Sequence, residues 1–178
     1  MMDLTKKGLP NVVEINGRSY SIYTDFRVWM RFANEFQRMR RTDKIDVSYL
    51  FKNEHPEYCD IRSLLEFCYP KSELPRSGTQ SKDILFDYAL DGDYIYAAFM
   101  SQYGIDLIDI KELHWHKFLA LFKGLKDDEM MCKIMGYRGY EKPNSKEDRF
   151  LKLKEAWRIE YVTPEEQEEI DKFNNMFK

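Results

Sequence analysis

The most regular pattern of hydrophobic positions lies between residues 83 and 138, on either side of Gly104. Before this glycine, apolar and aromatic positions recur every three or four residues, which is the spacing of one helix face. These positions are Leu85, Tyr88, Gly92, Ile95, Phe99 and Tyr103. After the glycine, residues 110–122 end in a continuous apolar run, so they predict a helix that is buried on most sides.

The boundaries of these two central helices carry sequence signals of their own. Gly104 predicts a C-cap, because glycine adopts the left-handed conformation at little cost. Asp109 is the expected N-cap of the second helix, with Glu112 three residues later as in a capping box. A third helix is expected at 127–135. The predicted core of this centre combines side chains of the first two helices: Ile95, Phe99, Trp115, Phe118, Leu121 and Phe122.

Residues 11–24 predict an N-terminal β-hairpin. Strand-forming side chains flank Asn16-Gly17, a pair that favours the positive φ angles of a tight hairpin turn. The strand formers are Val12, Ile15, Tyr20, Ile22 and Tyr23. Because two strands alone are marginally stable in water, the hairpin must lie on the helices, pair with another strand or be completed by a partner.

Residues 25–68 predict further helices. Asp25 is the expected N-cap of a helix with an apolar stripe, formed by Phe26, Trp29, Met30, Ala33 and Phe36. The arginines at its end, Arg38, Arg40 and Arg41, complement the helix dipole, with a phosphate-binding patch as the alternative. Two short helices are expected within 45–69, separated by residues 53–56. The second carries Ile61, Leu64, Leu65, Phe67 and Cys68.

Proline, glycine and serine mark the remaining breaks in the chain. Residues 69–82 read as an exposed loop, and residues 136–144 as a second breaker. Residues 145–178 predict two C-terminal helices, the first capped by Ser145 and the second beginning at Thr163-Pro164. The first carries Phe150, Leu153, Trp157 and Tyr161. The second has only a narrow apolar stripe, formed by Ile170, Phe173 and Phe177. The expected fold is therefore mainly α within the α+β class, a single helical domain over residues 1–178 with an N-terminal hairpin.

Composition limits the classes of function. The chain has 178 residues, 33% of them charged, and a net charge of −3, which gives no general attraction for nucleic acid. It begins without the apolar run of a signal peptide and contains no stretch long enough to span a membrane. The three scattered cysteines, Cys59, Cys68 and Cys132, indicate a reduced, cytoplasmic setting.

Candidate chemical motifs are incomplete, so no catalytic, metal or cofactor site is expected. His114 and His116 would point to different sides of a helix, which favours hydrogen-bonded histidines over metal ligands. His55 and Cys59 could meet, but no second pair completes a zinc site. The acidic run Asp87, Asp91 and Asp93 hints at a calcium loop, yet alanines occupy ligand positions there, and a solvated helix face is the preferred interpretation. Phosphate-binding and nucleophile motifs are absent from the sequence.

The aromatic and methionine content indicates an interaction module. The chain holds 12 Tyr, 12 Phe, 3 Trp and 9 Met, more than a core of this size needs, and such residues are enriched at interfaces. A DNA-binding regulator is the alternative from another class. Such a regulator would need a basic recognition helix, whereas residues 127–135 begin with acidic side chains.

A family resemblance adds to this interpretation. Residues 86–110, FDYALDGDYIYAAFMSQYGIDLIDI, followed by LHWHKFLALFKGL and IMGYR, resemble a family of small phage and prophage proteins of Gram-positive bacteria. The Asp25-Phe26-Arg27-Val28-Trp29 element also resembles this family, which is encoded beside the tail tape-measure gene of long-tailed phages. The resemblance implies a non-catalytic tail assembly chaperone in the cytoplasm of the bacterial host.

The resemblance also implies partners. The expected partner is the tape-measure protein, with the tail tube protein and self-association as further contacts and with neither nucleic acid nor membrane as a partner. A structural tail protein retained in the virion is the alternative. The candidate partner-binding residues are Trp29, Ile170, Phe173 and Phe177.

Overall fold

The computed structural model describes residues 4–40, 44–57, 59–70, 83–141, 149–161 and 172–173. Its elements follow one another as β1 (Val12–Ile15), β2 (Arg18–Ser21), α1 (Phe26–Arg38), the 3₁₀ turn η1 (Ser48–Leu50), α2 (Ile61–Cys68), α3 (Gly92–Tyr103), α4 (Trp115–Lys123), α5 (Met130–Arg138) and α6 (Arg149–Ala156). The predicted fold class, mainly helical α+β with an N-terminal hairpin, is confirmed.

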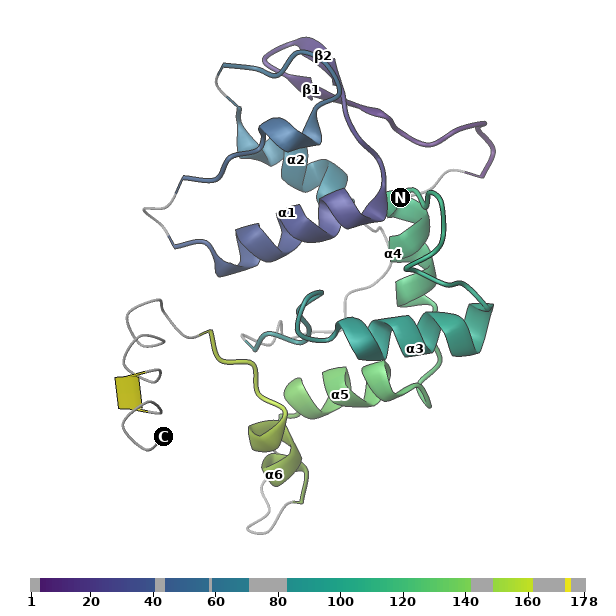
Figure 1. Ribbon diagram of the computed structural model, residues 1–178, viewed down its shortest axis with the longest axis vertical. Coiled ribbons are helices and arrows are strands. Elements are labelled where there is room, and N and C mark those ends of the chain that lie inside the picture. The colour runs from purple at the N-terminus through teal and green to yellow at the C-terminus, as the bar shows by residue number, and fades with distance from the viewer. Residues whose placement is uncertain are drawn as a thin grey trace.

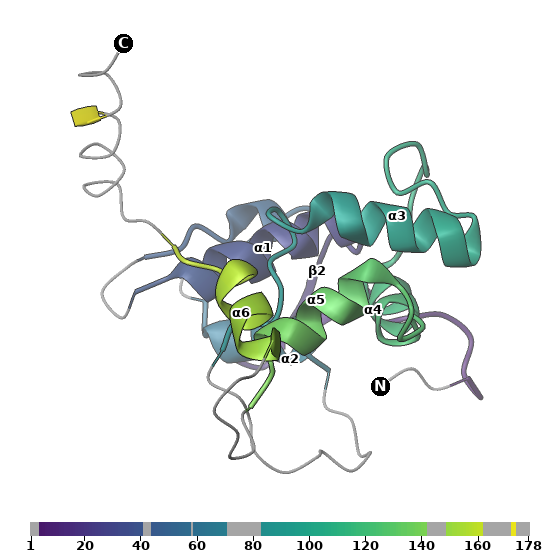
Figure 2. The same cartoon turned by 90° about the horizontal axis from the view of Figure 1, so that it is seen from below.

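The elements form two groups that meet at α4. Figure 1 shows the hairpin, α1 and α2 in the upper part of the molecule and α3, α5 and α6 in the lower part. Helix α4 packs against both α1 and α3, while α5 packs against α3 and α6. The lengthwise arrangement of α3 beside α5 is also visible from below (Figure 2). A residue on α4 can therefore contact both groups.

The hairpin lies on the helices, which is one of the three arrangements left open by the sequence. Asn16 and Gly17 both have positive φ, 52° and 74°, as the tight turn requires. Val13 and Ile15 are buried, and β1 packs against α2. The second strand is also extended by an antiparallel bridge between Ile22 and Phe51. The hairpin is thus anchored within its own chain.

Helices α1 and α4 begin side by side. The Phe26 N–H donates to the Leu113 carbonyl at 2.9 Å, and the Trp115 N–H donates to the Thr24 carbonyl at 2.7 Å. The Asp25 carboxylate caps α1 by accepting from the Arg27 N–H at 3.0 Å, as predicted. These two backbone bonds hold the starts of the two helices together.

The predicted start of α4 at residue 110, with Asp109 as its cap, is wrong. The Asp106 carboxylate instead accepts the N–H groups of Ile108 and Asp109, at 2.9 and 3.0 Å, and forms a turn before the helix. The helix begins five residues later than predicted, at Trp115, and its cap is His114. Asp109 does not cap a helix, because the Asp106 carboxylate already binds the backbone N–H groups of Ile108 and Asp109 in a turn.

Arg27 holds this turn from a distance in sequence. Its Nη2 donates to the carbonyls of Leu107, Ile108 and Ile110, at 2.9, 3.2 and 2.9 Å. The segment from Asp25 to Trp29 is therefore bound to the turn after Gly104, and both segments belong to the stretches that resemble the phage family. Carbonyls bound in this way no longer need helical partners, which explains why the turn does not continue as a helix.

Other predicted boundaries shift in the same direction. Helix α3 begins at Gly92, whereas the pattern began at Leu85, and α5 begins at Met130 after an acidic turn. The predicted C-cap is confirmed, since Gly104 has φ 64°. The first short helix predicted within 45–69 is only the turn η1, and Tyr161 lies beyond the end of α6. Residues 71–82, Ser145 and the predicted start at Thr163 lie outside the described residues.

The predicted aromatic core is confirmed and centres on Phe118. Its ring stacks on Phe99 of α3 at 5.0 Å, on Phe26 of α1 at 5.3 Å and on Trp115 at 5.6 Å between centroids. Phe118 and Trp115 have no exposed surface, and Phe122 is also buried, whereas Leu121 is only partly buried. One side chain thus joins three helices.

Candidate functional site

The acidic run before α3 is buried, so the interpretation of Asp87 and Asp91 as a solvated helix face is wrong. Asp87 is 0% exposed and Asp91 is 2% exposed. The two are linked directly, because the Asp87 N–H donates to the Asp91 carboxylate at 2.9 Å. Two buried carboxylates need partners, since an unpaired charge in the interior is strongly unfavourable. Each carboxylate binds a different arginine.

Asp87 joins α1 to the segment after α6. The Arg38 Nη2 and the Tyr161 hydroxyl both donate to Asp87 Oδ2, at 2.8 and 2.9 Å. Gln37 donates to the Tyr161 hydroxyl at 2.6 Å and so completes the contact. Arg38 therefore serves as a partner for a buried carboxylate as well as standing in the last turn of its helix.

Asp91 joins α5 to the same region. The Arg138 Nη1 and Nη2 donate to its two oxygens, at 2.6 and 2.9 Å, which is a bidentate pair. Arg138 also donates to the carbonyls of Trp157 and Leu85, at 2.6 and 3.1 Å. The guanidinium is itself buried, and its position is fixed on three sides.

Hydrogen bonds decide the ionisation of Asp87. Burial alone would raise the pKa of this carboxyl, but the Leu90 N–H and the Arg38 guanidinium stabilise the charged form and leave the pKa below its usual value. The hydrogen bond to Asp87 raises the pKa of Arg38. Burial, and then the bond to the Asp87 carboxylate, raises the pKa of Tyr161. The network is therefore ionic at neutral pH, with Asp87 as the acceptor.

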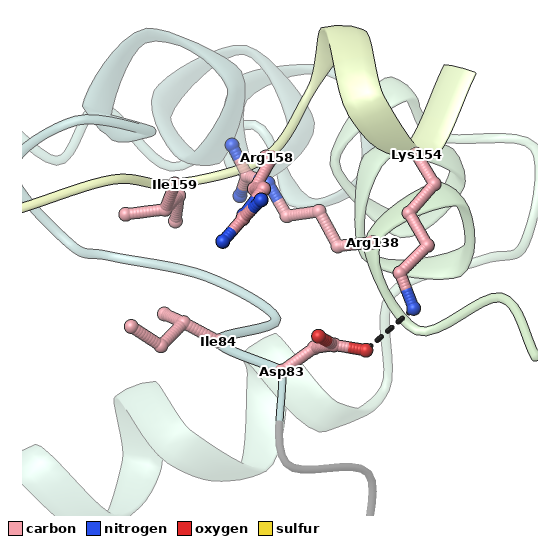
Figure 3. Close-up of a pocket in the computed structure, with 6 residues that line it drawn as sticks. All are labelled: Asp83, Ile84, Arg138, Lys154, Arg158 and Ile159. Carbon is pink, nitrogen blue, oxygen red and sulfur yellow. Dashed lines mark hydrogen bonds and ion pairs between the residues drawn. The ribbon is translucent and has the colours of Figure 1, made fainter. Parts of the chain in front are cut away.

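A cationic pocket opens beside this network. It encloses about 170 Å³ and is lined by Asp83, Ile84, Arg138, Lys154, Arg158 and Ile159. Figure 3 shows the two isoleucines on one side of the space and the Lys154–Asp83 ion pair on the other, with the two arginines between them. The Lys154 Nζ lies 2.6 Å from the Asp83 carboxylate. Arg158 is 69% exposed and lies 3.5 Å from Glu160.

A larger, more apolar groove lies at the other group of elements. It encloses about 610 Å³ between residues 44–48 and the start of α2. Its apolar lining consists of Ile45, Val47, Pro56, Cys59, Ile61 and Leu64, and its polar lining of Lys44, Asp46, Ser48, His55 and Glu57. The size falls within the range of about 300–1,000 Å³ typical of ligand sites.

Polar contacts from α1 and η1 hold the wall of this groove. The Tyr49 hydroxyl donates to Glu35 at 2.6 Å, and the Arg31 guanidinium lies 3.9 Å above the Tyr49 ring. The Asp46 carboxylate accepts from the Ser48 N–H at 2.9 Å. At the base of the groove, Leu64 is fully buried. The side of the groove formed by residues 46–48 is therefore held against α1 through Tyr49.

The predicted partner-binding residues are separated by the structure. Trp29 lies in the core with no exposed surface, and its indole N–H donates to the Tyr23 carbonyl at 2.6 Å. A side chain in that position is not available at the surface, so Trp29 is reassigned to the core. Phe173 is 58% exposed, whereas Ile170 and Phe177 lie outside the described residues.

The histidines are hydrogen-bonded, as expected. The His116 Nε2 lies 2.8 Å from the Phe67 carbonyl and the His114 Nε2 lies 2.9 Å from the Pro10 carbonyl. The His114 Nδ1 accepts the His116 N–H at 3.0 Å and caps α4. Burial lowers the pKa of both side chains. Within the described ranges, no group of three or more His, Cys, Asp or Glu could hold a metal ion.

Sequence reasoning missed Arg138, Asp87, Asp91 and the groove at residue 45. Arg138 follows a methionine-rich segment and looks like an ordinary basic residue at a helix end. One signal was available, because carboxylates four positions apart can share one face of a turn. The groove forms where residues 44–48 approach residues 55–64. A pattern within either segment does not show that the two segments approach each other.

The fold and these two surface features define a small, mainly helical α+β protein with an apolar groove and a cationic pocket. Among the described helices, none is long and apolar enough to cross a membrane. A family model described as "Bacteriophage Gp15 protein" matches residues 5–161, which is most of the chain. The chain belongs to this family of bacteriophage proteins. Comparison with curated proteins gives no significant match, and comparison with solved structures gives none either.

Proposed function

We propose that this phage protein is a non-catalytic tail assembly chaperone. It would bind the tape-measure protein in the cytoplasm of the bacterial host while the tail tube is built. The observation that carries the proposal is the apolar groove at Ile45, Val47 and Ile61. Membership of a bacteriophage family supports a role in phage multiplication.

The shape of the groove suits one face of a helix. Helix-in-groove recognition uses apolar side chains at helical spacing that enter an apolar channel. The lining here is apolar at its base, while its polar residues include both a cation, Lys44, and two carboxylates, Asp46 and Glu57. Mixed charges at the groove suit the flanks of an amphipathic helix, which usually carry both signs.

The tape-measure protein is the partner that such a groove would serve. It is a very long helical protein, as the family resemblance implies, and its apolar faces would aggregate if they stayed exposed. A small protein can cover these faces in many copies, and each contact can stay weak. The sum along a repeating target is strong by avidity, yet single copies can still leave when tube subunits arrive. The tail tube protein would then replace the chaperone.

Co-purification tests this function. The double variant Ile45→Ala with Ile61→Ala truncates two apolar side chains that line the groove, and each substitution removes three carbons. At about 0.8 kcal/mol per buried carbon, each loss would weaken a single contact more than tenfold. Co-expressed tape-measure protein should therefore lose its bound copies and become insoluble, whereas wild type keeps it soluble.

A matched variant controls for general surface effects. Ile108 is another isoleucine, exposed and outside the groove, so Ile108→Ala should leave co-purification unchanged. Circular dichroism checks that the double variant remains folded. Wild-type binding by the folded double variant would contradict the groove as the contact, and a tape-measure protein that never co-purifies with wild type would contradict the chaperone function.

A further inference from the structure

The cationic pocket beside Arg138 has unused hydrogen-bond donors. A guanidinium has five N–H donors, and Arg138 uses four of them on Asp91, Leu85 and Trp157. Lys154 donates to Asp83 and to the Tyr140 carbonyl, which occupies two of its three N–H groups. Within the described residues, the Arg158 guanidinium makes one ion pair, with Glu160 at 3.5 Å, and its other N–H groups are open.

The charge of the lining favours an anion. The lining itself holds three cations and one carboxylate, Asp83. Two further carboxylates stand behind it: Asp91 is held on both oxygens by Arg138, and Glu160 lies 3.5 Å from Arg158. Arg138 is already buried and held in one position, so binding a ligand costs it little further conformational entropy.

The remaining wall is aliphatic. Ile84 and Ile159 line the same space from the side opposite the Lys154–Asp83 pair (Figure 3). A ligand that fills the pocket therefore needs an anionic head and a short apolar stem. At about 170 Å³, the pocket is smaller than the sites of drug-sized ligands, which start at about 300 Å³, and suits a single side chain.

We infer that this pocket binds the side chain of a glutamate presented by a partner protein. The two methylene groups of the glutamate lie against Ile84 and Ile159, and its carboxylate accepts from Arg158, Lys154 and the spare Arg138 donor. The inference goes beyond the proposed function, because it names a second, polar contact site that shares no lining residue with the apolar groove.

Methyl NMR with small probes tests the inference. The ligand probe is N-acetyl-glutamate N-methylamide, in which only the side-chain carboxylate is charged. The δ1 methyl groups of Ile84 and Ile159 report on the pocket, and that of exposed Ile108 serves as an internal control. We expect saturable shifts at both pocket methyls and none at Ile108, and no shifts with the neutral glutamine analogue.

Variants separate the pocket from general charge effects. Arg158→Gln removes an exposed charge from the pocket and should weaken binding about tenfold or more, as expected for a charge-assisted hydrogen bond. Arg62→Gln removes another exposed arginine, which lies outside the pocket, and should leave binding unchanged. Equal shifts with the glutamine analogue, or equal affinity in Arg158→Gln, would overturn the inference. Tighter binding of N-acetyl-leucine would also overturn it, because the pocket would then recognise a chain terminus.

Discussion

His114 shows how a single titratable side chain holds a helix end in this protein. Its Nδ1 must accept the His116 N–H, and its Nε2 faces a carbonyl, so it must carry the proton there. Only the neutral ring with the proton on Nε2 satisfies both contacts. Protonation of Nδ1 would remove the cap of α4.

The first prediction concerns acid stability. Burial lowers the pKa of His114 and His116 in the folded chain, whereas an unfolded histidine has a pKa of about 6.5. Their contribution to folding is thus fully present above about pH 6.5 and is lost as the pH falls through the folded-state values. Urea unfolding at pH 7.5, 6.5 and 5.5 should show falling stability.

Two variants identify the source of this pH dependence. His114→Asn keeps a capping acceptor without a titrating ring, so the loss of stability between pH 7.5 and 5.5 should become smaller. His55→Asn replaces an exposed histidine and should leave it unchanged. An unchanged pH dependence in His114→Asn would show that the neutral cap does not carry the effect.

The second prediction concerns the buried ion pair. Arg138→Gln leaves the Asp91 carboxylate buried without its counter-charge, which should cost about 3–5 kcal/mol of unfolding free energy. Arg158→Gln, in the lining of the same pocket, removes an exposed charge and should change stability by less than about 1 kcal/mol. Denaturant titration measures both. A similar, small effect of the two substitutions would contradict the structural role of Arg138.

The sequence could not have predicted this pair. Asp91 and Arg138 lie 47 positions apart, and Asp87 and Arg38 lie 49 apart. In one dimension, a partnered carboxylate looks the same as a solvated one, so the acidic run was interpreted as surface. The same ambiguity applies to Trp29, because a buried indole and a partner-facing indole have the same place in a hydrophobic pattern.

At the scale of elements, the third prediction concerns the contact between α3 and α4. Phe118→Ala removes the ring that stacks on Phe99, Phe26 and Trp115, so it should cost about 3–5 kcal/mol. Ile108→Ala truncates an exposed apolar side chain and serves as the control. If Phe118→Ala melts at the same temperature as wild type, the assignment of Phe118 to the centre of the core is contradicted.

Helical periodicity predicted most of the helices and the central aromatic core, but it did not predict where the helices begin, and it predicted a helix where the structure has only the turn η1. The stripe before Gly104 and the apolar run after it correctly placed Phe118 against Phe99. The starts of α3 and α4 were assigned too early, because residues in turns can have the spacing of a helix face. Those turns are fixed by Arg27 and Arg138, which bind backbone carbonyls from other parts of the chain.

At the scale of the whole molecule, the fourth prediction concerns the C-terminal segment. Phe173 is exposed, and the narrow stripe expected from Ile170 to Phe177 could bury little surface on its own chain. We hypothesise that this segment mediates self-association or capture of the tape-measure protein. Deleting residues 163–178 should then reduce the oligomer size in light scattering or the amount of co-purified partner.

Charge substitutions test the same segment without removing it. Phe173→Glu and Phe177→Glu should give the same loss as the deletion, provided that circular dichroism shows folded protein. If these variants and the deletion remain folded and both readouts are unchanged, the C-terminal segment is not the contact. The groove at Ile45 and Ile61 then remains as the partner surface.

The most direct test of the chaperone role is quantitative mass spectrometry of the phage that encodes this chain. The ratio of this protein to the tape-measure protein should be measured in cells shortly before lysis and again in purified virions. A chaperone that coats the tape measure and then leaves predicts several copies per tape-measure chain in the cells and almost none in the virions. A fixed number of copies per virion would instead identify a structural tail component and contradict the chaperone role.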